Sequence, residues 1–187
     1  MKAGQLVVAT PSLTDPHFAR TVVLLLQADE EDGALGVVLN RPTGTDLSEV
    51  LPSWAHLSAD PAVVFTGGPV SPTSAVCLGR GRLRRAALAA YAELEGVPGG
   101  AVGTVDLEAA PAELAAAVEH VRVFAGYAGW SRGQLEAEVA EGAWWVLDSL
   151  PVDAFASDPA LLWQRVLLRQ GPPIAFAASY PDDPTLN

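Results

Sequence analysis

The sequence of 187 residues predicts a single α+β domain built around a mixed sheet. Short apolar runs and short helical segments alternate irregularly, whereas a regular doubly wound fold would repeat one strand and one helix. At least one pair of neighbouring runs has the pattern of a hairpin, which requires antiparallel pairing. Half of the residues are apolar, so the chain can bury a core without disulfides or metal ions. We expect one domain over residues 1–187, with an extended tail from about residue 172.

The N-terminal half contains four apolar runs with the length of strands and two short helical signals. Residues 21–26 are β-branched or aliphatic throughout, which is typical of a central strand. A loop that ends in Asp32-Gly33 separates this run from the next one and gives the clearest hairpin signal in the sequence. Asp15-Pro16 and Asp46 each predict the start of a helical segment. The predicted strands are residues 6–9, 21–26, 34–39 and 62–66, and the helical segments are residues 17–20 and 46–51.

The C-terminal half continues with strands and helices in turn. We expect residues 74–78 to form a strand that pairs with residues 62–66. Residues 83–95 are rich enough in alanine for a helix but follow an arginine cluster, so both a helix and a loop stay open. The strongest helix signal begins at Asp158-Pro159 and ends before Gly171. The other predicted strands are residues 102–107, 121–125 and 144–147, and the other helices are residues 111–120 and 134–141.

The charge balance is strongly acidic, with 22 Asp and Glu residues, 11 Lys and Arg residues and a formal net charge of −11. This charge repels polyphosphates at long range and disfavours nucleic-acid binding. Four of the cationic residues nevertheless lie within six positions. This cluster is either a solvated loop that balances charge or a contact site for phosphate or an acidic partner. Its members are Arg80, Arg82, Arg84 and Arg85.

Cysteine usage and hydropathy indicate a cytoplasmic protein. The single cysteine, Cys77, rules out an intramolecular disulfide and a cysteine-rich zinc site, and its apolar neighbours predict that it is buried. No stretch approaches the roughly 20 apolar residues of a membrane span, so we expect no membrane partner. The apolar run at residues 6–9 is too short for a secretory signal.

One motif imitates a catalytic site. Residues 129–133 match G-x-S-x-G, the nucleophile elbow of α/β-hydrolases, with Ser131 at its centre. A serine nucleophile needs a histidine to accept its proton, and in that fold the histidine follows the serine in the chain. All three histidines, His17, His56 and His120, precede Ser131, and they lack the spacing of a metal site. The chain also lacks a phosphate loop and a dinucleotide fingerprint. The sequence therefore predicts no catalytic residue, no metal ion and no cofactor, and thus a protein that is not an enzyme.

Four blocks of sequence, taken in order, resemble the YqgE/AlgH family of small bacterial proteins. The resemblance implies an α+β fold with a mixed, barrel-like sheet and several short helices packed around it. It also implies a bacterial cytoplasmic protein without an established reaction, and some family members are linked to the regulation of gene expression. The blocks are residues 4–18 (with GQL, ATP and DPHF), 33–42 (GALGVVLNRP), 67–70 (GGPV) and 126–136 (with GYAGW and GQLE), and tryptophans typical of the family lie at positions 144 and 163.

Three of these blocks place residues suited to binding at the ends of predicted strands. An arginine, flexible glycines, large aromatic side chains and the start of a helix would together form a pocket, if the three loops meet at one end of the sheet. Such a pocket suits a small anionic or polar ligand or the carboxylate of a protein partner. A structural alternative is that the glycines set turns, the aromatic side chains pack and Arg41 pairs with Glu136. The candidate residues are Asn40, Arg41, Gly67, Gly68, Tyr127, Trp130, Gln134 and Glu136.

The leading hypothesis is a non-enzymatic binding or regulatory protein that acts through a small anionic ligand or a protein partner. One alternative is a transcription-related regulator that contacts nucleic acid through the cluster from Arg80 to Arg85. Another is a small hydrolase with an unrecognised site. The sequence gives no indication of oligomeric state.

Overall fold

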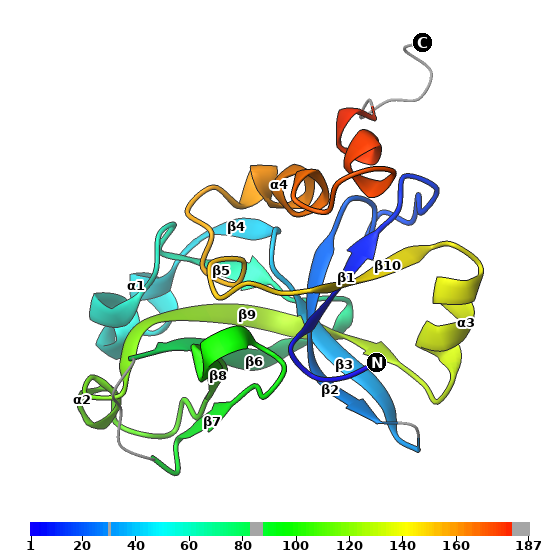
Figure 1. Ribbon diagram of the computed structural model, residues 1–187. Helices are drawn as coiled ribbons and strands as arrows, with labels where there is room; N and C mark the ends of the chain where they lie inside the picture. Colours follow the sequence, from blue (N-terminus) through cyan, green and yellow to red (C-terminus); the bar gives the residue numbers. More distant parts are fainter. Residues whose placement is uncertain (30, 83–87, 181–187) are drawn as a thin grey trace.

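The computed structural model describes residues 1–29, 31–82 and 88–180, which form one curled ten-stranded sheet with short helices around it (Figure 1). The strands follow the order β10-β1-β2-β3-β9-β6-β8-β7, and the pair of β4 and β5 joins β9. The strands are β1 (Gln5–Ala9), β2 (Val22–Asp29), β3 (Gly33–Val38), β4 (Pro42–Asp46), β5 (Val63–Thr66), β6 (Val70–Gly81), β7 (Tyr91–Glu93), β8 (Val102–Val105), β9 (Val118–Trp130) and β10 (Trp144–Asp148).

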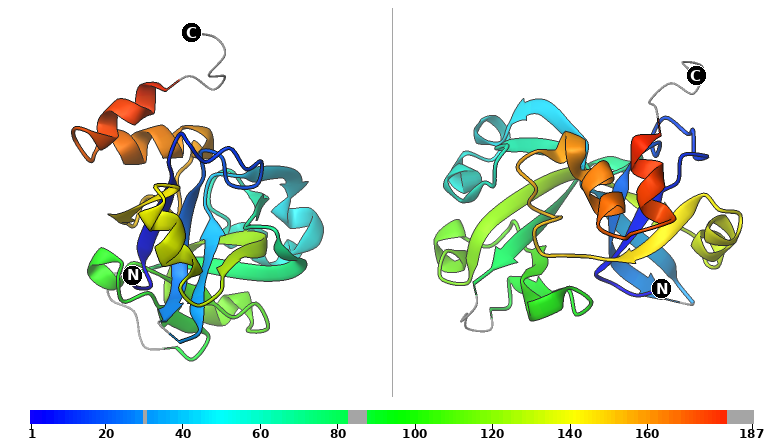
Figure 2. Two further views of the ribbon diagram at one scale, coloured as in Figure 1. Left: turned by 90° about the vertical axis from the view of Figure 1, so that its right-hand side faces the viewer. Right: turned by 45° about the horizontal axis from the view of Figure 1, so that its top comes forward.

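Short helices surround this sheet on several sides. In the view of Figure 1, α1 and α2 lie at the left, α3 at the right, and α4 across the top. Two further views show η4 beside α4 at the same end of the molecule (Figure 2). The α-helices are α1 (Leu47–Val50), α2 (Pro111–Leu114), α3 (Gln134–Ala140) and α4 (Leu162–Leu168), and the 3₁₀ helices are η1 (Pro52–Leu57), η2 (Pro98–Gly100), η3 (Pro159–Leu161) and η4 (Ile174–Ser179).

The long strand β9 organises the sheet because three other strands pair with it. β6 runs antiparallel along one edge of β9, and β3 pairs antiparallel with its C-terminal end. β5 runs parallel to β9, with Phe65 opposite Phe124. The sheet is therefore mixed, as the sequence predicts. None of the helices in the described part of the chain has the length and hydropathy needed to cross a membrane.

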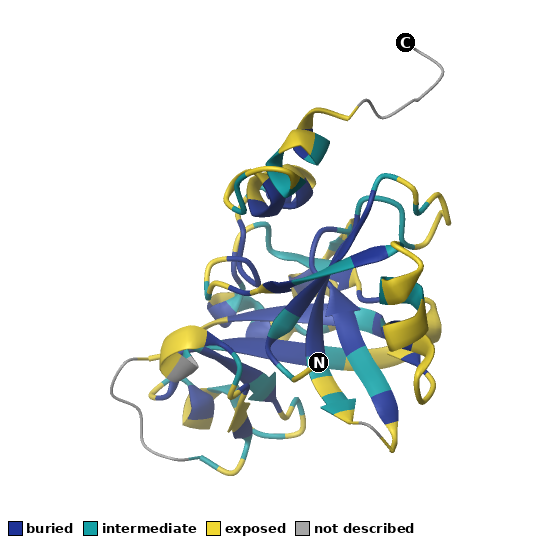
Figure 3. Cartoon of the chain, turned by 45° about the vertical axis from the view of Figure 1, so that its right-hand side comes forward, coloured by how far each residue is buried: buried dark blue, intermediate teal, exposed yellow. Residues whose placement is uncertain are grey.

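Apolar clusters cover both faces of β1 and of the first half of β2, and β3, β8 and β9 are also mostly buried (Figure 3). The largest cluster joins β1, β2, β3 and β9 to α4, with Trp163 and Val166 among its members. A second cluster lies under α1, η1 and α2 and includes Trp54 and Leu114. The third includes Leu135 of α3. Burial on both faces explains why the sequence shows continuous apolar runs instead of alternation.

Several local predictions are confirmed. β2 and β3 form the expected antiparallel hairpin, and Gly33 closes it with a φ of 91°. The Asp46 carboxylate accepts a hydrogen bond from the Ser48 N–H and thereby caps α1. Cys77 is buried. Gly171 follows α4 with a φ of 74°, a conformation that favours glycine at the end of a helix.

Other predictions about elements are wrong. Residues 111–120 do not form one helix, because α2 ends at Leu114 and β9 already begins at Val118. Pairing of β9 with β6 therefore overrides the helical preference of the alanine-rich segment. The strand at 74–78 belongs to β6 and pairs with β8 and β9, not with β5. Residues 17–20 form hydrogen-bonded turns and no helix. Part of the ambiguous segment at 83–95 lies outside the described residues, and its end forms β7.

Candidate functional site

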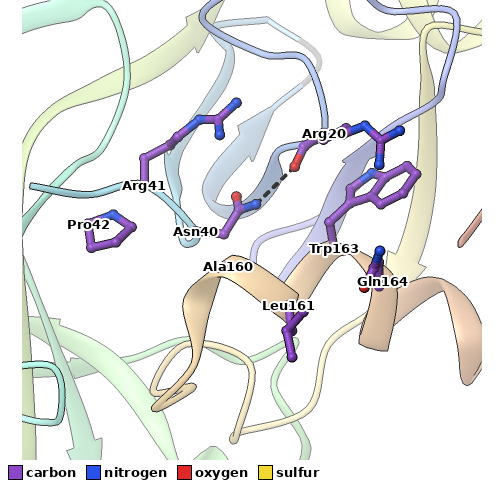
Figure 4. A pocket seen from close by; sticks show the side chains of 8 residues that line it. All are labelled: Arg20, Asn40, Arg41, Pro42, Ala160, Leu161, Trp163 and Gln164. Atoms are coloured by element: carbon purple, nitrogen blue, oxygen red, sulfur yellow. Dashed lines mark hydrogen bonds between the residues drawn. The ribbon is translucent and has the colours of Figure 1, made fainter. Parts of the chain in front are cut away.

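Two adjoining pockets, which share Arg41 and Pro42, form a groove that we call the arginine groove. The first has a volume of about 490 Å³ and lies between the connection from β3 to β4 and the start of the α4 region (Figure 4). The second has a volume of about 220 Å³. The first pocket is lined by Arg20, Asn40, Arg41, Pro42, Ala160, Leu161, Trp163 and Gln164, and the second by Pro16, His17, Val38, Arg41, Pro42, Thr66, Gly68 and Pro69.

The side chain of Asn40 fixes the turn that carries Arg20. Its Oδ1 accepts a hydrogen bond from the Val22 N–H at 3.0 Å, and its Nδ2 donates to the Arg20 carbonyl at 2.9 Å (Figure 4). Arg20 has a φ of 56°, a left-handed conformation that costs a residue other than glycine about 1–2 kcal/mol. The buried Asn40 amide therefore stabilises an unfavourable backbone conformation at the wall of the groove.

Arg20 and Trp163 form the other wall of the first pocket. The Arg20 guanidinium carbon lies 4.8 Å from the centre of the Trp163 ring, a cation–π distance, and one Nη donates to the Tyr180 carbonyl at 2.6 Å. The indole N–H of Trp163 donates to the Ala9 carbonyl at 2.8 Å. Trp163 is 2% exposed, so it holds Arg20 in place more than it offers a surface of its own.

Arg41 lies between the two pockets and is half-buried. One Nη donates to the Ala19 carbonyl at 2.6 Å. Within the described residues no carboxylate forms an ion pair with Arg41, so the pairing with Glu136 that belongs to the structural alternative does not form. Glu136 lies instead in a different pocket beside Asp29 and Arg132. A guanidinium has five N–H donors, so most of those of Arg41 remain available to a ligand in the groove.

The two glycines after β5 let two backbone segments approach closely. A Cβ atom at Gly68 would lie 2.2 Å from the Tyr127 carbonyl carbon, and one at Gly67 would lie 2.2 Å from the Gly126 carbonyl oxygen. Gly68 also has a φ of 153° and lines the second pocket. Glycine is therefore required at both positions for packing against β9, and only Gly68 lies beside Arg41.

The aromatic candidates lie apart from Arg41. Tyr127 and Trp130 belong to β9 and not to a loop, and they line a pocket on the side of Val70 and Asp32. Trp130 is 5% exposed, and its ring packs against Phe18 and Trp144. The structure thus brings Asn40, Arg41 and Gly68 together but places the two aromatic side chains elsewhere.

The remaining candidates near α3 form a hydrogen-bonded network. Gln134 Oε1 lies 3.1 Å from the Ser131 hydroxyl and accepts a bond from the Ser131 N–H, and Gln134 Nε2 donates to Glu138 at 2.8 Å. Glu138 Oε2 also accepts bonds from the indole N–H groups of Trp130 and Trp144. In the described chain no histidine is hydrogen-bonded to Ser131. This network stabilises the junction of β9, α3 and β10.

The basic cluster is only partly described. Arg80 Nε lies 3.6 Å from a carboxylate oxygen of Glu119 on the neighbouring strand, and Arg82 Nε donates to the Ala115 carbonyl at 3.1 Å. Arg84 and Arg85 lie outside the described residues. The two described arginines thus have protein partners, so this region gives a nucleic-acid contact no further support.

Three residues of the groove, His17, Arg20 and Trp163, carry no signal in the sequence that predicts a binding role. Arg20 and Trp163 are 143 positions apart in the chain, and no local pattern connects them. An arginine does not indicate a left-handed backbone, because glycine or asparagine is the usual residue in that conformation. The conformation of Arg20 could therefore not be predicted from its residue type. Arg20 and Trp163 come into contact only because α4 packs over β1 and β2.

This fold and site define a class of small α+β proteins. Members of this class have a curled mixed sheet and a positively charged groove at one end. A family profile described as DUF179, AlgH-like, matches residues 6–175. The chain therefore belongs to the AlgH-like family.

Curated relatives and solved structures agree with this assignment. A UPF0301 protein of Streptomyces avermitilis is 52% identical over 190 residues, which cover 98% of this chain and 94% of that protein. One from Mycobacterium tuberculosis is 44% identical, with 100% and 91% covered. The crystal structure of a Corynebacterium diphtheriae protein matches with a TM-score of 0.88 and 30% identity, covering 96% of this chain and 92% of that one. The solution structure of the AlgH protein from Pseudomonas aeruginosa gives a TM-score of 0.68 and 28% identity, with 96% and 94% covered.

Proposed function

We propose that this protein is a non-enzymatic, cytoplasmic binding protein that holds a small anionic ligand in the arginine groove. The observation that carries the proposal is the position of Arg41. It is half-buried at the wall shared by two pockets, and within the described residues it has a backbone carbonyl but no carboxylate as a partner. A guanidinium in this setting suits a carboxylate or phosphate, which it can bind through two parallel N–H groups.

The surroundings of Arg41 support a small ligand over a polymer. Arg20 and His17 line the same groove, and the Asn40 amide fixes the turn that carries Arg20. The whole chain carries a formal charge of −11, which opposes long polyanions but acts less on a small ion inside a cationic groove. The volume of the first pocket, about 490 Å³, lies in the usual range for small-molecule sites.

Such a ligand would regulate the protein by stabilising the contacts between the turn at Arg20 and the α4 region. Both segments line the first pocket, and they are joined across it by the contact of Arg20 with Trp163. A ligand that contacts Arg41 and α4 together would strengthen this connection.

Thermal unfolding in the presence of inorganic phosphate, pyrophosphate, succinate and citrate tests this proposal. A ligand at 100 times its Kd stabilises the folded state by about 2.7 kcal/mol, which is a measurable shift in Tm. Isothermal titration with the best of these ions gives the Kd. Replacement of Arg41 by alanine removes a charged hydrogen bond worth about 1.5–3 kcal/mol and should raise the Kd about 10- to 150-fold.

Arg132→Ala is the matched control, because Arg132 is exposed, lies in a different pocket and causes the same change in net charge. We expect its Kd to stay within about twofold of the parent value, since a distant exposed charge is screened by salt. The proposal fails if none of the four ions stabilises the protein, or if the two arginine variants weaken binding equally.

A further inference from the structure

A third hollow, which we call the apolar pocket, has a volume of about 380 Å³ and shares no lining residue with the arginine groove. Residues of β4, β5, β6 and β9 form its base, and residues near the end of α1 and after β8 form its sides. β4 separates the two sites. Pro42 lines the arginine groove, whereas Thr43 and Thr45 line the apolar pocket, because successive side chains of a strand point to opposite faces.

The lining of the apolar pocket is uncharged, although charged residues make up 18% of the chain. Its floor is an uncovered part of the second core cluster, against which Leu51, Val64 and Leu107 pack while remaining half-buried. Water in this hollow therefore contacts mainly hydrocarbon. An apolar ligand would displace that water, which is favourable in proportion to the apolar area covered.

Hydroxyl groups also line the apolar pocket. Thr43 donates its hydroxyl hydrogen to the Val64 carbonyl at 2.7 Å. Thr45, Thr73 and Ser74 also line the pocket, and in the described structure their hydroxyl groups have no hydrogen-bond partner. Each can donate one hydrogen bond and accept others. The pocket thus offers polar contacts without charge, which suits a neutral ligand that carries oxygen atoms.

The wall formed by residues 72–75 is built by an irregularity in the sheet. β6 pairs with β9 at Val70 opposite Tyr127 and again at Ala75 opposite Ala125, so four residues of β6 bulge out opposite Gly126. Ser71 has a φ of 46°, and Gly126 has a φ of 71°. A Cβ atom at Gly126 would lie 2.8 Å from the Val70 carbonyl oxygen, so the bulge depends on this glycine. Bulges and strained residues of this kind are frequent beside binding sites.

We propose that the apolar pocket binds an uncharged, mostly apolar small molecule that carries one or two hydroxyl or carbonyl oxygens. The floor covers the apolar part of the ligand, and the hydroxyl groups of Thr45, Thr73 and Ser74 bind its oxygens. This site is independent of the arginine groove, so either proposal can fail without the other.

Fluorescence titration with N-phenyl-1-naphthylamine, a neutral probe that brightens in apolar surroundings, tests the proposal. Ala125→Phe places a ring in the pocket from the centre of the sheet. Ala75→Trp does so from an exposed position of β6, which spares the fold. The matched control is Ala92→Trp, since Ala92 is an exposed strand residue of β7 outside the pocket. Thermal unfolding verifies that each variant is folded.

We expect the parent protein to bind one probe per chain with saturation. Ala125→Phe and Ala75→Trp should each raise the Kd at least about tenfold, because the added ring occupies the space of the probe. Ala92→Trp and Arg41→Ala should leave the Kd within about twofold, because neither position touches the pocket. Absence of saturable binding, or an equal Kd in the Ala75→Trp and Ala92→Trp variants, would overturn the proposal.

Discussion

Replacement of Arg122 tests how the sheet holds the segment that leads to the arginine groove. Arg122 lies in β9 and is 2% exposed. Its guanidinium donates hydrogen bonds to the carbonyl groups of Ala154, Ala156 and Asp60, and its carbon lies 4.4 Å from the centre of the Phe65 ring. Residues 154–156 precede η3 and α4, which line the groove. Arg122 therefore connects the helical wall of the site to the centre of the sheet.

Opposing contributions to the free energy of unfolding decide how far the replacement of Arg122 destabilises the protein. Burial lowers the pKa of Arg122 from its ordinary value to about 10, so the charged side chain is destabilised by about 3 kcal/mol, which its removal relieves. Removal also leaves the buried carbonyls of Ala154 and Ala156 without donors, at about 2 kcal/mol each. Arg122→Met, which still fills the space over Phe65, should thus cost about 1 kcal/mol. Arg122→Ala additionally leaves a cavity worth about 3 kcal/mol and should cost about 4 kcal/mol in total.

Equilibrium unfolding in urea, followed by the fluorescence of the five tryptophans, gives these free energies of unfolding. Arg80→Ala on neighbouring β6 is the control, because its ion pair with Glu119 is exposed and should contribute less than about 1 kcal/mol. A loss below about 1 kcal/mol in Arg122→Ala would refute the reasoning, because the unpaired carbonyls and the cavity would then cost less than about 4 kcal/mol together instead of the about 7 kcal/mol assigned to them. An equal loss in the methionine and alanine variants would show that the space over Phe65 does not matter.

Two further predictions concern Cys77 on β6 and Glu138 on α3. Burial raises the pKa of the Cys77 thiol to about 12, so at pH 8 only about one thiol in ten thousand is ionised, and a disulfide reagent should label Cys77 only after urea unfolding. Rapid labelling of the folded protein would contradict this expectation. Glu138→Ala leaves the indole N–H groups of Trp130 and Trp144 without their acceptor and should destabilise the protein by about 2 kcal/mol in thermal unfolding. Glu138→Gln, which keeps an acceptor oxygen, should cost about half as much, and equal losses would show that the carboxylate oxygen is not what matters.

Part of the site could be predicted from local sequence. Asn40, Arg41 and Gly68 follow strands that are recognisable from their apolar runs, and residues that follow strands often carry function. Their meeting in the arginine groove required the pairing of β5 with β9, which no local pattern indicates. Tyr127 and Trp130, with Gly126 and Gly129 beside them, lie between the predicted strand at residues 121–125 and the predicted helix at residues 134–141, so the sequence predicts a loop there. Both glycines lie inside β9, where Gly126 instead permits the bulge of β6.

The sequence by itself determined the features that depend on neighbours in the chain. These are the α+β class, the hairpin of β2 and β3, the cap at Asp46, the burial of Cys77 and membership of the family. Tertiary structure alone decided the length of β9, the burial of Arg122 and the contact of Arg20 with Trp163. Local preferences for a helix or a turn are worth less than about 1 kcal/mol per residue, so pairing and packing between distant segments can override them. The groove is built from such distant segments, and for that reason it became visible only in the folded chain.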